Sequence, residues 1–527
     1  MRPTLILVLC TAIAAIAGCG GPAEDVKKTD APGGNRTLVR GLGGEPETLD
    51  PRLAADNPSL TLMSELYEGL TAQAADGSTV AGAAGSWTIS ADGTAWTFVL
   101  RPGLRWSDGE PLTALDFARG IAKAKAADSE APYAPLLAGI RGITVGADGM
   151  ALTLQLWRPM PHLPALLALP VAAPDPSHAN ASSEVGNGPY RLIARRPGER
   201  VELERNPHYH DRGRVGIERV TWLTLDDLNT ELNLYRTGEL DITSEVPNAR
   251  LDWLRRNLGA ELYVSPYLST YGYAVNLRRL DDRDARAALA MAIGRERITA
   301  LVTGAGERAA FGWVAPGIAG YANPRFEWAP LDDDARLARA RGHWRAAAAR
   351  GKAPARLLLC TDTSANHHRT AVALADQWHT AIDVEVELLE LEWKAYLAER
   401  ARPGRCDLVR FGWSADYADP EAFLELFESR HPQNTQGYSS RRYDTLLYES
   451  RRAADADGRL RRLAEAERVL LQDVAVIPVF HRVSKRLVKP DIVGVADHPL
   501  GHLATRQLRW RETAEVVDWA RPEGQVR

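Results

Sequence analysis

Apolar and polar side chains alternate over several short stretches of the chain, and this alternation predicts strands with one buried face. Residues 86–90 and 96–100 both alternate in this way, and the segment between them contains Ala-Asp-Gly, a typical turn sequence. Residues 142–157 form a second stretch of the same kind. The pattern therefore predicts two β-hairpins in the first third of the chain.

Helical spacing of apolar residues is found between these strand-like stretches. Residues 60–70 show this spacing, and Thr113 and Asp116 form the capping pattern that opens a helix. Residues 37–43 are strand-like and lead into a turn-rich loop. No sequence period recurs along the chain, which disfavours solenoids and propellers.

The N-terminus has a positive start followed by a short apolar run, as in secretory signal peptides. The run from Leu5 to Ala17 has about 13 residues, whereas a membrane-spanning helix needs about 20. The small residues directly before Cys19 resemble a bacterial lipobox, in which the cysteine sulfur receives a diacylglyceryl group, although Ile16 replaces the usual leucine. We therefore expect residues 1–19 to be a lipoprotein signal peptide with Cys19 as the lipidated residue. A plain signal peptide with an incidental cysteine is the alternative.

The segment after the lipobox indicates where the protein works. Residues 20–36 contain almost nothing to bury and are expected to form a flexible tether. No later stretch approaches about 18 uncharged apolar residues, so we expect a soluble body outside the cytoplasm. The expected location is the cell envelope, on its periplasmic or extracytoplasmic face, with a lipid anchor in a membrane.

Composition and charge exclude several classes of protein. The 527 residues are 45% hydrophobic and 25% charged, which rules out a disordered tail protein, a collagen-like chain and a disulfide scaffold. The 64 basic and 68 acidic residues are spread along the whole chain and leave a net charge of −4. Because no one-signed field results, we expect no nucleic-acid partner.

Four cysteines occur, at positions 10, 19, 360 and 406, and none shows the Cys-x-x-Cys spacing of zinc ribbons. We therefore expect no structural metal. Cys360 falls at the end of one strand-like run and Cys406 at the start of another. If these strands are parallel neighbours, the two thiols lie about 13 Å apart, beyond the Cα separation of about 6.8 Å that a disulfide allows. The pattern predicts two buried free thiols.

A long motif then points to a known family. Residues 86–117 read SWxxSxDGxxWTFxLRxGLRWSDGxPLTAxDF, residues 186–190 read GNGPY and residues 412–420 read GWSADYADP. These motifs resemble the bacterial extracellular solute-binding proteins of the peptide and nickel ABC-transporter class, family 5, and most of all their oligopeptide-binding branch. The resemblance covers about residues 38 to 512.

The resemblance implies an α/β protein with the two-lobed fold of periplasmic binding proteins, a hinge, and the extra third domain of the large class. Ligand contacts from both lobes would exist only in the closed state, so ligand would shift the population toward closure. The expected division is lobe I at 37–70, 186–275 and 484–515, the extra domain at 71–185, and lobe II at 276–483.

The function implied by the resemblance is that of a substrate-binding lipoprotein of an ABC importer, which captures short peptides between its lobes and delivers them to the permease subunits in the membrane. We expect a monomer without a cofactor. The same cleft would also serve a murein peptide, a signalling peptide, haem or another cargo. A secreted hydrolase is a further alternative, but no Gly-x-Ser-x-Gly, His-Glu-x-x-His or Ser-x-x-Lys set stands in a convincing context, so we expect no enzyme.

Asp416 is the leading candidate for ligand binding. A receptor for many peptide sequences should hold the termini and the main chain, and the ammonium end needs a carboxylate in a desolvated cleft. Asp416 matches the family position that pairs with the peptide α-amino group. The alternative is a helix N-cap or a surface acid, although Asp419, followed by Pro420 and an apolar helical run, fits the capping role better.

The peptide carboxylate needs a cation, and Arg410 and His367 match family positions that meet it directly or through water. Arginine suits a carboxylate because its fork donates two parallel hydrogen bonds. A structural ion pair is the alternative for Arg410. Two adjacent histidines, His367 and His368, also suggest a metal, but no ligand at suitable spacing completes such a site, so we expect none.

Four further residues belong to the predicted ligand site. They are aromatic or small residues on the same strand-like segments as the charged candidates, and the aromatic ones are either pocket walls or core: Gly412, Trp413, Tyr417 and Tyr271. The family resemblance has one gap here, because related peptide binders carry a disulfide next to the cleft tryptophan. This chain has Ser414 at that place and no cysteine near Tyr271.

Overall fold

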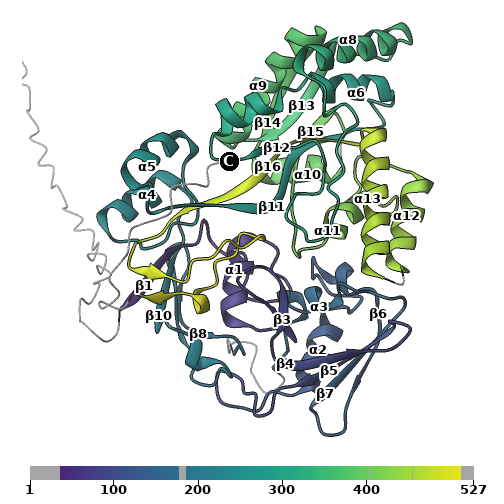
Figure 1. The fold of residues 1–527 in the computed structure, drawn as a ribbon. Helices are drawn as coiled ribbons and strands as arrows, with labels where there is room; N and C mark the ends of the chain where they lie inside the picture. Colours follow the sequence, from purple (N-terminus) through teal and green to yellow (C-terminus); the bar gives the residue numbers. More distant parts are fainter. Residues whose placement is uncertain (1–35, 177–184, 403, 432, 454, 512–527) are drawn as a thin grey trace, which may run out of the picture.

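The computed structural model has two lobes joined by a pair of long strands (Figure 1). It describes residues 36–176, 185–402, 404–431, 433–453 and 455–511. Cys19, the predicted signal peptide and nearly all of the predicted tether lie outside these ranges.

The lower lobe contains a four-stranded sheet in the order β1-β10-β9-β8. Its strands are β1 (Thr37–Gly41), β8 (Tyr190–Arg196), β9 (Arg200–Arg205) and β10 (Arg219–Leu223). Strand β1 runs parallel to β10, and the other pairs are antiparallel. Helices α1 (Asn57–Leu66), α4 (Leu228–Thr237) and α5 (Leu251–Leu258) belong to the same part of the chain, together with the short pair β17 (Ile492–Val493) and β18 (Arg509–Trp510).

A second four-stranded sheet, β4-β5-β7-β6, confirms both predicted hairpins. It comprises β4 (Ala84–Ile89), β5 (Ala95–Leu100), β6 (Ile140–Val145) and β7 (Ala151–Leu156), next to β2 (Thr71–Gln73), β3 (Thr79–Ala81) and the helices α2 (Ala114–Ala124) and α3 (Leu163–Leu166). The turn between β4 and β5 contains Gly93 in the left-handed region, with φ of 70°, which favours glycine. The predicted capping pattern is confirmed, because Thr113 N donates to Asp116 Oδ2 over 2.7 Å.

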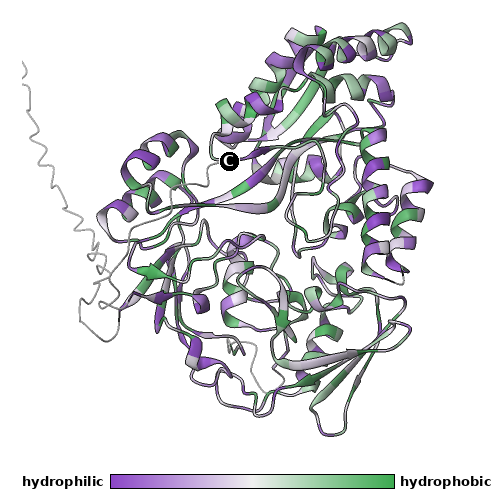
Figure 2. Cartoon of the chain, viewed as in Figure 1, coloured by the Kyte–Doolittle hydropathy of each residue, from purple (hydrophilic) through white to green (hydrophobic). Residues whose placement is uncertain are grey.

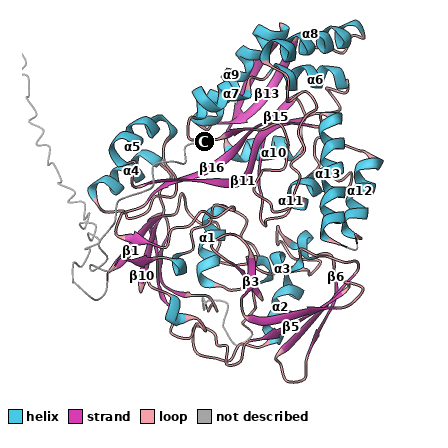
Figure 3. Ribbon diagram, in the orientation of Figure 1, coloured by secondary structure: helices cyan, strands magenta, loops and turns pink. Residues whose placement is uncertain are grey.

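The upper lobe is built on a six-stranded sheet in the order β12-β16-β11-β15-β13-β14. Its strands are β11 (Leu262–Val275), β12 (Arg308–Ala309), β13 (Arg356–Asp362), β14 (Glu385–Leu391), β15 (Leu408–Ser414) and β16 (Val476–Leu487). The helices of this lobe lie beside the sheet (Figure 3): α6 (Arg283–Ala292), α7 (Arg295–Ile298), α8 (Asp333–Ala349), α9 (Ala365–Ile382), α10 (Trp393–Ala401), α11 (Glu421–Leu424), α12 (Arg441–Arg451) and α13 (Ala456–Asp473). Hydrophilic and hydrophobic residues alternate along α8, α12 and α13 (Figure 2).

Strands β11 and β16 connect the lobes. Their antiparallel ladder runs from the Leu262–Leu487 pair to the Ala274–Val476 pair, and an isolated bridge from Val488 to Ile242 continues it into the lower lobe. The ladder shifts register between Pro266 and Thr270. A register shift bends a strand locally, so the connection between the lobes contains an irregular point in its middle.

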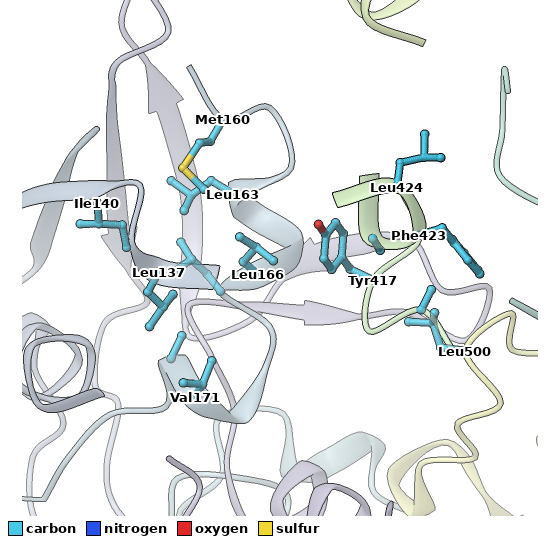
Figure 4. Close-up of a cluster of buried hydrophobic side chains, with 14 of the residues drawn as sticks. Leu137, Ile140, Met160, Leu163, Leu166, Val171, Tyr417, Phe423, Leu424 and Leu500 are labelled. Carbon is cyan, nitrogen blue, oxygen red and sulfur yellow. The ribbon is translucent and has the colours of Figure 1, made fainter. Parts of the chain in front are cut away.

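One hydrophobic cluster extends across the interface between the hairpin sheet and the upper lobe (Figure 4). Leu166 of α3 faces Tyr417 in the loop after β15, and Leu163 lies farther from Tyr417, beside Met160. Phe423 and Leu424 of α11 continue the cluster. Burial of these apolar side chains holds the two parts together.

The prediction of two free thiols is wrong, because Cys360 and Cys406 form a disulfide with a Cα–Cα distance of 5.9 Å. Strands β13 and β15 are indeed parallel, and Leu359 is opposite Leu408. Cys406, however, precedes β15 instead of lying in it, so distances along an extended strand do not apply to it. Its carbonyl accepts a hydrogen bond from Asn276 Nδ2 over 3.0 Å, which holds the bend that brings it to Cys360.

Candidate ligand-binding site

A cleft between the lobes contains Asp416. The cavity around Asp416 has an empty volume of about 1080 Å³, and an adjoining cavity of about 2080 Å³ shares Ser64, Tyr267 and Ser414 with it. The side chains that line the cleft include residues of α1, of the loop between α2 and β6, of β11, of the end of β15 and of the C-terminal segment 498–507. The cleft is therefore assembled from segments that are far apart in the sequence.

Asp416 lies half-buried in the wall of this cleft, directly after β15. Its Oδ1 accepts a hydrogen bond from the hydroxyl of Tyr133 over 2.9 Å. In the described part of the chain, no lysine, arginine or histidine forms an ion pair with this carboxylate. Burial raises the pKa of Asp416 to about 6, and the hydrogen bond from Tyr133 offsets only part of that effect. A carboxylate in this state lacks a positive partner.

Strand β15 offers a free edge next to Asp416. On one side it pairs with β11 along its whole length, from Leu408 to Ser414. On the other side only Leu408 and Val409 pair with β13, so among the described strands none covers the edge from Phe411 to Ser414. An uncovered strand edge presents N–H and C=O groups to which an extended peptide can add.

Arg410 and His367 lie near each other, and both contact Asp362. Arg410 is 7% exposed and forms an ion pair with Asp362 over 2.7 Å, and His367 Nδ1 lies 2.7 Å from the same carboxylate. Burial alone would raise the pKa of Asp362, but the hydrogen bond from His367 and the charge of Arg410 hold it at about 2. Neither Arg410 nor His367 lines the cavity around Asp416 or the one adjoining it.

Two predicted aromatic residues are core residues in this structure. Tyr271 is 1% exposed and stacks on Phe480 with ring centroids 4.6 Å apart. Tyr417 is also 1% exposed and stacks on His162 at 5.5 Å.

Gly412 and Trp413 lie on the free-edged part of β15 and are half-buried. Gly412 is opposite Tyr271 and Trp413 is opposite Thr270 on β11. The ring of Trp413 packs against the hydrophobic cluster shared with the hairpin sheet. Ser414, the position of the missing family disulfide, is opposite Ser269, and the two hydroxyls are hydrogen-bonded over 2.9 Å.

Asp419 lies one residue before the N-cap position predicted for it, because Pro420 is the N-cap of α11. Its Oδ1 accepts a hydrogen bond from Glu421 N at the beginning of α11, and its Oδ2 lies 2.6 Å from Arg459. Asp416 makes no such contact with a helix start.

Sequence reasoning missed Tyr133 and Tyr267. Tyr133 lies in a proline-flanked loop of another part of the chain, 283 residues before the carboxylate to which it donates. Tyr267 lies in β11, and nothing in the sequence around it distinguishes it from the other residues of that strand. No local signal marks either residue, because their role comes only from the approach of the lobes.

Two kinds of feature are absent from the residues that the structure describes. Within these ranges, no three or more His, Cys, Asp or Glu side chains are grouped so that they could hold a metal ion. None of the described helices combines the length and the apolar character needed to cross a membrane.

The sequence and the fold both match known proteins. A sequence model described as bacterial extracellular solute-binding proteins, family 5 Middle, matches residues 78–435. The chain is 32% identical to the periplasmic oligopeptide-binding protein OppA of Escherichia coli, covering 95% of this chain and 98% of that one. It is 30% identical to the periplasmic murein peptide-binding protein MppA of the same organism, covering 87% and 90%.

Solved structures agree with this match. The Haemophilus influenzae OppA complex with RPPGFSPFR has a TM-score of 0.79 and 30% identity, covering 90% of this chain and 99% of that one. The Escherichia coli murein tripeptide binding protein MppA has a TM-score of 0.80 and 29% identity, covering 90% and 98%. The expected two-lobed α/β fold is thereby confirmed, and the chain belongs to the bacterial extracellular solute-binding proteins, family 5.

Proposed function

We propose that this chain is the substrate-binding component of an ABC importer and captures short peptides in the cleft between its lobes. The observation that carries the proposal is Asp416, a half-buried carboxylate that forms no ion pair with a described cation and lines the cleft between the lobes. The α-ammonium group of a peptide would supply the missing charge. Relatives whose names describe oligopeptide binding support this assignment.

The main chain of the peptide would pair with the free edge of β15. This pairing gives affinity without reading side chains, as expected of a receptor for many sequences. Tyr133 donates to Asp416 from the opposite part of the molecule, so the site is complete only when both parts meet.

Arg410 and His367 remain our candidates for the peptide carboxylate. Asp362 occupies both of them here, but Arg410 Nε is buried and finds no acceptor among the described residues. This donor is buried and Arg410 lines neither cavity, so the role proposed for Arg410 and His367 rests on the family resemblance.

The decisive experiment is calorimetry of di- to pentapeptides with Asp416→Asn. Loss of the carboxylate leaves the ammonium group buried and unpaired, which costs about 3 to 5 kcal/mol, or ~10² to 10⁴ in affinity. Acetylation of the peptide N-terminus should lower the affinity of the wild-type protein by a similar factor. Asp457→Asn, at an exposed residue of α13, makes the same charge change and should leave affinity unchanged. Wild-type affinity in Asp416→Asn would contradict the proposal.

A murein peptide is the second candidate cargo, because the murein peptide-binding MppA is 30% identical over most of the chain. Mass spectrometry of the ligand that copurifies separates the two. A heterogeneous set of short peptides supports nutrient uptake, whereas a single murein fragment supports the second candidate.

We further propose that Cys19 is lipidated and tethers the protein to a membrane, next to the permease, as a monomer that acts by binding and not by catalysis. The lipobox-like sequence supports the tether. In cells, Cys19→Ser should move the protein from the membrane fraction to the soluble fraction. Equal membrane association of both forms would contradict the anchor.

A further inference from the structure

A third cavity lies in the upper lobe between α6, α8 and α13, and none of its lining residues lines the cleft around Asp416. Its empty volume, which includes open solvent, is about 710 Å³. Figure 1 shows α6 and α8 at the top of the upper lobe, away from the lower lobe. The function proposed above makes no use of this cavity.

The floor of this cavity is apolar and partly aromatic. It is formed by Ala287, Met291, Phe326, Trp328, Leu471 and Val474. The rings of Phe326 and Trp328 stack with centroids 4.7 Å apart, and both side chains are 4% exposed. The floor is therefore apolar and closely packed, with little of each ring exposed.

The rim carries four arginines: Arg283, Arg325, Arg339 and Arg468. All four are exposed, and in the described ranges none forms an ion pair with a carboxylate. Arg283 Nε donates to the carbonyl of Gln472 over 2.6 Å, and the guanidinium of Arg325 lies 4.8 Å from the ring centroid of Phe311. The rim therefore carries positive charge that the protein does not neutralise.

The remaining polar groups of the cavity do not balance this charge. Glu327 is the lining carboxylate, and it accepts a hydrogen bond from Gln472 Nε2 over 3.2 Å. His343 shares a hydrogen bond of 2.8 Å with Asp284, whose other oxygen binds Arg350. Asp284 is thus already used by residues other than the four rim arginines.

From the apolar floor and the cationic rim we propose that this cavity binds a small organic anion with an apolar or aromatic body and a carboxylate or phosphate head. The body would lie against the apolar floor, and the head would reach Arg339 and Arg468, whose forks suit either anion. The site would act independently of peptide capture, and its ligand would be a free small molecule.

Calorimetry with 4-phenylbutyrate and its neutral amide, on protein saturated with peptide, tests this site. We expect saturable binding of the carboxylate and at least about tenfold weaker binding of the amide. The double variant Arg339→Glu/Arg468→Glu should weaken binding of 4-phenylbutyrate at least about tenfold. If that variant does not fold, Arg339→Gln/Arg468→Gln takes its place.

The control is Arg345→Glu/Arg461→Glu, which makes the same charge change at exposed arginines of the same two helices outside the cavity. It should bind like wild type. An equal loss in both variants would show a general effect of net charge and overturn the proposal. Equal binding of acid and amide, or no saturable binding at millimolar concentration, would also overturn it.

Discussion

At the scale of a single residue, the ionised carboxylate of Asp416 lowers the stability of the empty protein but is the form that would bind the peptide. Its pKa of about 6 in the folded chain lies above the value of about 3.9 expected when unfolded. Ionisation of this group therefore destabilises the empty protein as the pH rises through about 6. A bound ammonium group would remove that cost, so part of the peptide affinity comes from relief of an unfavourable free state.

The pH dependence of binding follows from the same residue. Below pH 6 Asp416 becomes protonated, while the peptide ammonium, with a pKa of about 8, stays charged. We expect affinity to fall about tenfold between pH 7 and pH 5, measured by calorimetry. Glu425, whose pKa burial raises to about 8, is already neutral near pH 7 and should not add to this slope.

Acetylated peptides provide the control for this pH profile. They lack the ammonium group, so whatever weak binding they retain should vary much less between pH 7 and pH 5. A flat profile for free peptides would contradict the role given to Asp416.

At the scale of elements, the strand β15 organises the site. Its sequence predicts a strand, and the structure agrees. That its edge is free from Phe411 to Ser414 follows from the short register with β13, which ends at Val409. Register depends on the neighbouring strand and cannot be derived from the segment alone.

The disulfide between β13 and the start of β15 should stabilise the upper lobe. It closes a separation of 46 residues, worth about 4 kcal/mol in the chain-entropy model. We expect Cys360→Ala/Cys406→Ala to lower the free energy of unfolding by about 2 to 4 kcal/mol, measured by denaturant titration. Peptide affinity should be unchanged, because neither cysteine lines the cleft. Two free thiols in the denatured, unreduced mature protein would contradict this pairing.

At the scale of the whole molecule, the contacts between lobes are both apolar and charged. Tyr417 and Leu166 face each other across the interface, and His162 lies 3.6 Å from Glu421 of α11. Glu421 is also paired with Arg451 and Arg459, so this interface contains a buried network of charges. Such networks are costly when one partner is removed, which favours a defined arrangement of the two parts.

Closure on peptide is the corresponding prediction. Because the proposed ligand site uses groups from both lobes, a bound peptide should shift the population to the compact state. We expect the radius of gyration from small-angle X-ray scattering to fall on addition of peptide. Peptide at 100 times its dissociation constant should also add about 2.7 kcal/mol to the free energy of unfolding. An unchanged radius with saturated peptide would contradict closure.

The sequence by itself determined the family, the two hairpins, the capped start of α2 and the chemical reason to choose Asp416. These features depend on motifs and on patterns within a few residues, which the local chain carries. Only the tertiary structure decided that Tyr133 reaches Asp416, that Asp362 occupies Arg410 and His367, and that Cys406 meets Cys360. Apart from the contact between His367 and Asp362, which spans five residues, these contacts join segments far apart in sequence. Their geometry depends on strand register and lobe packing, which no local pattern contains.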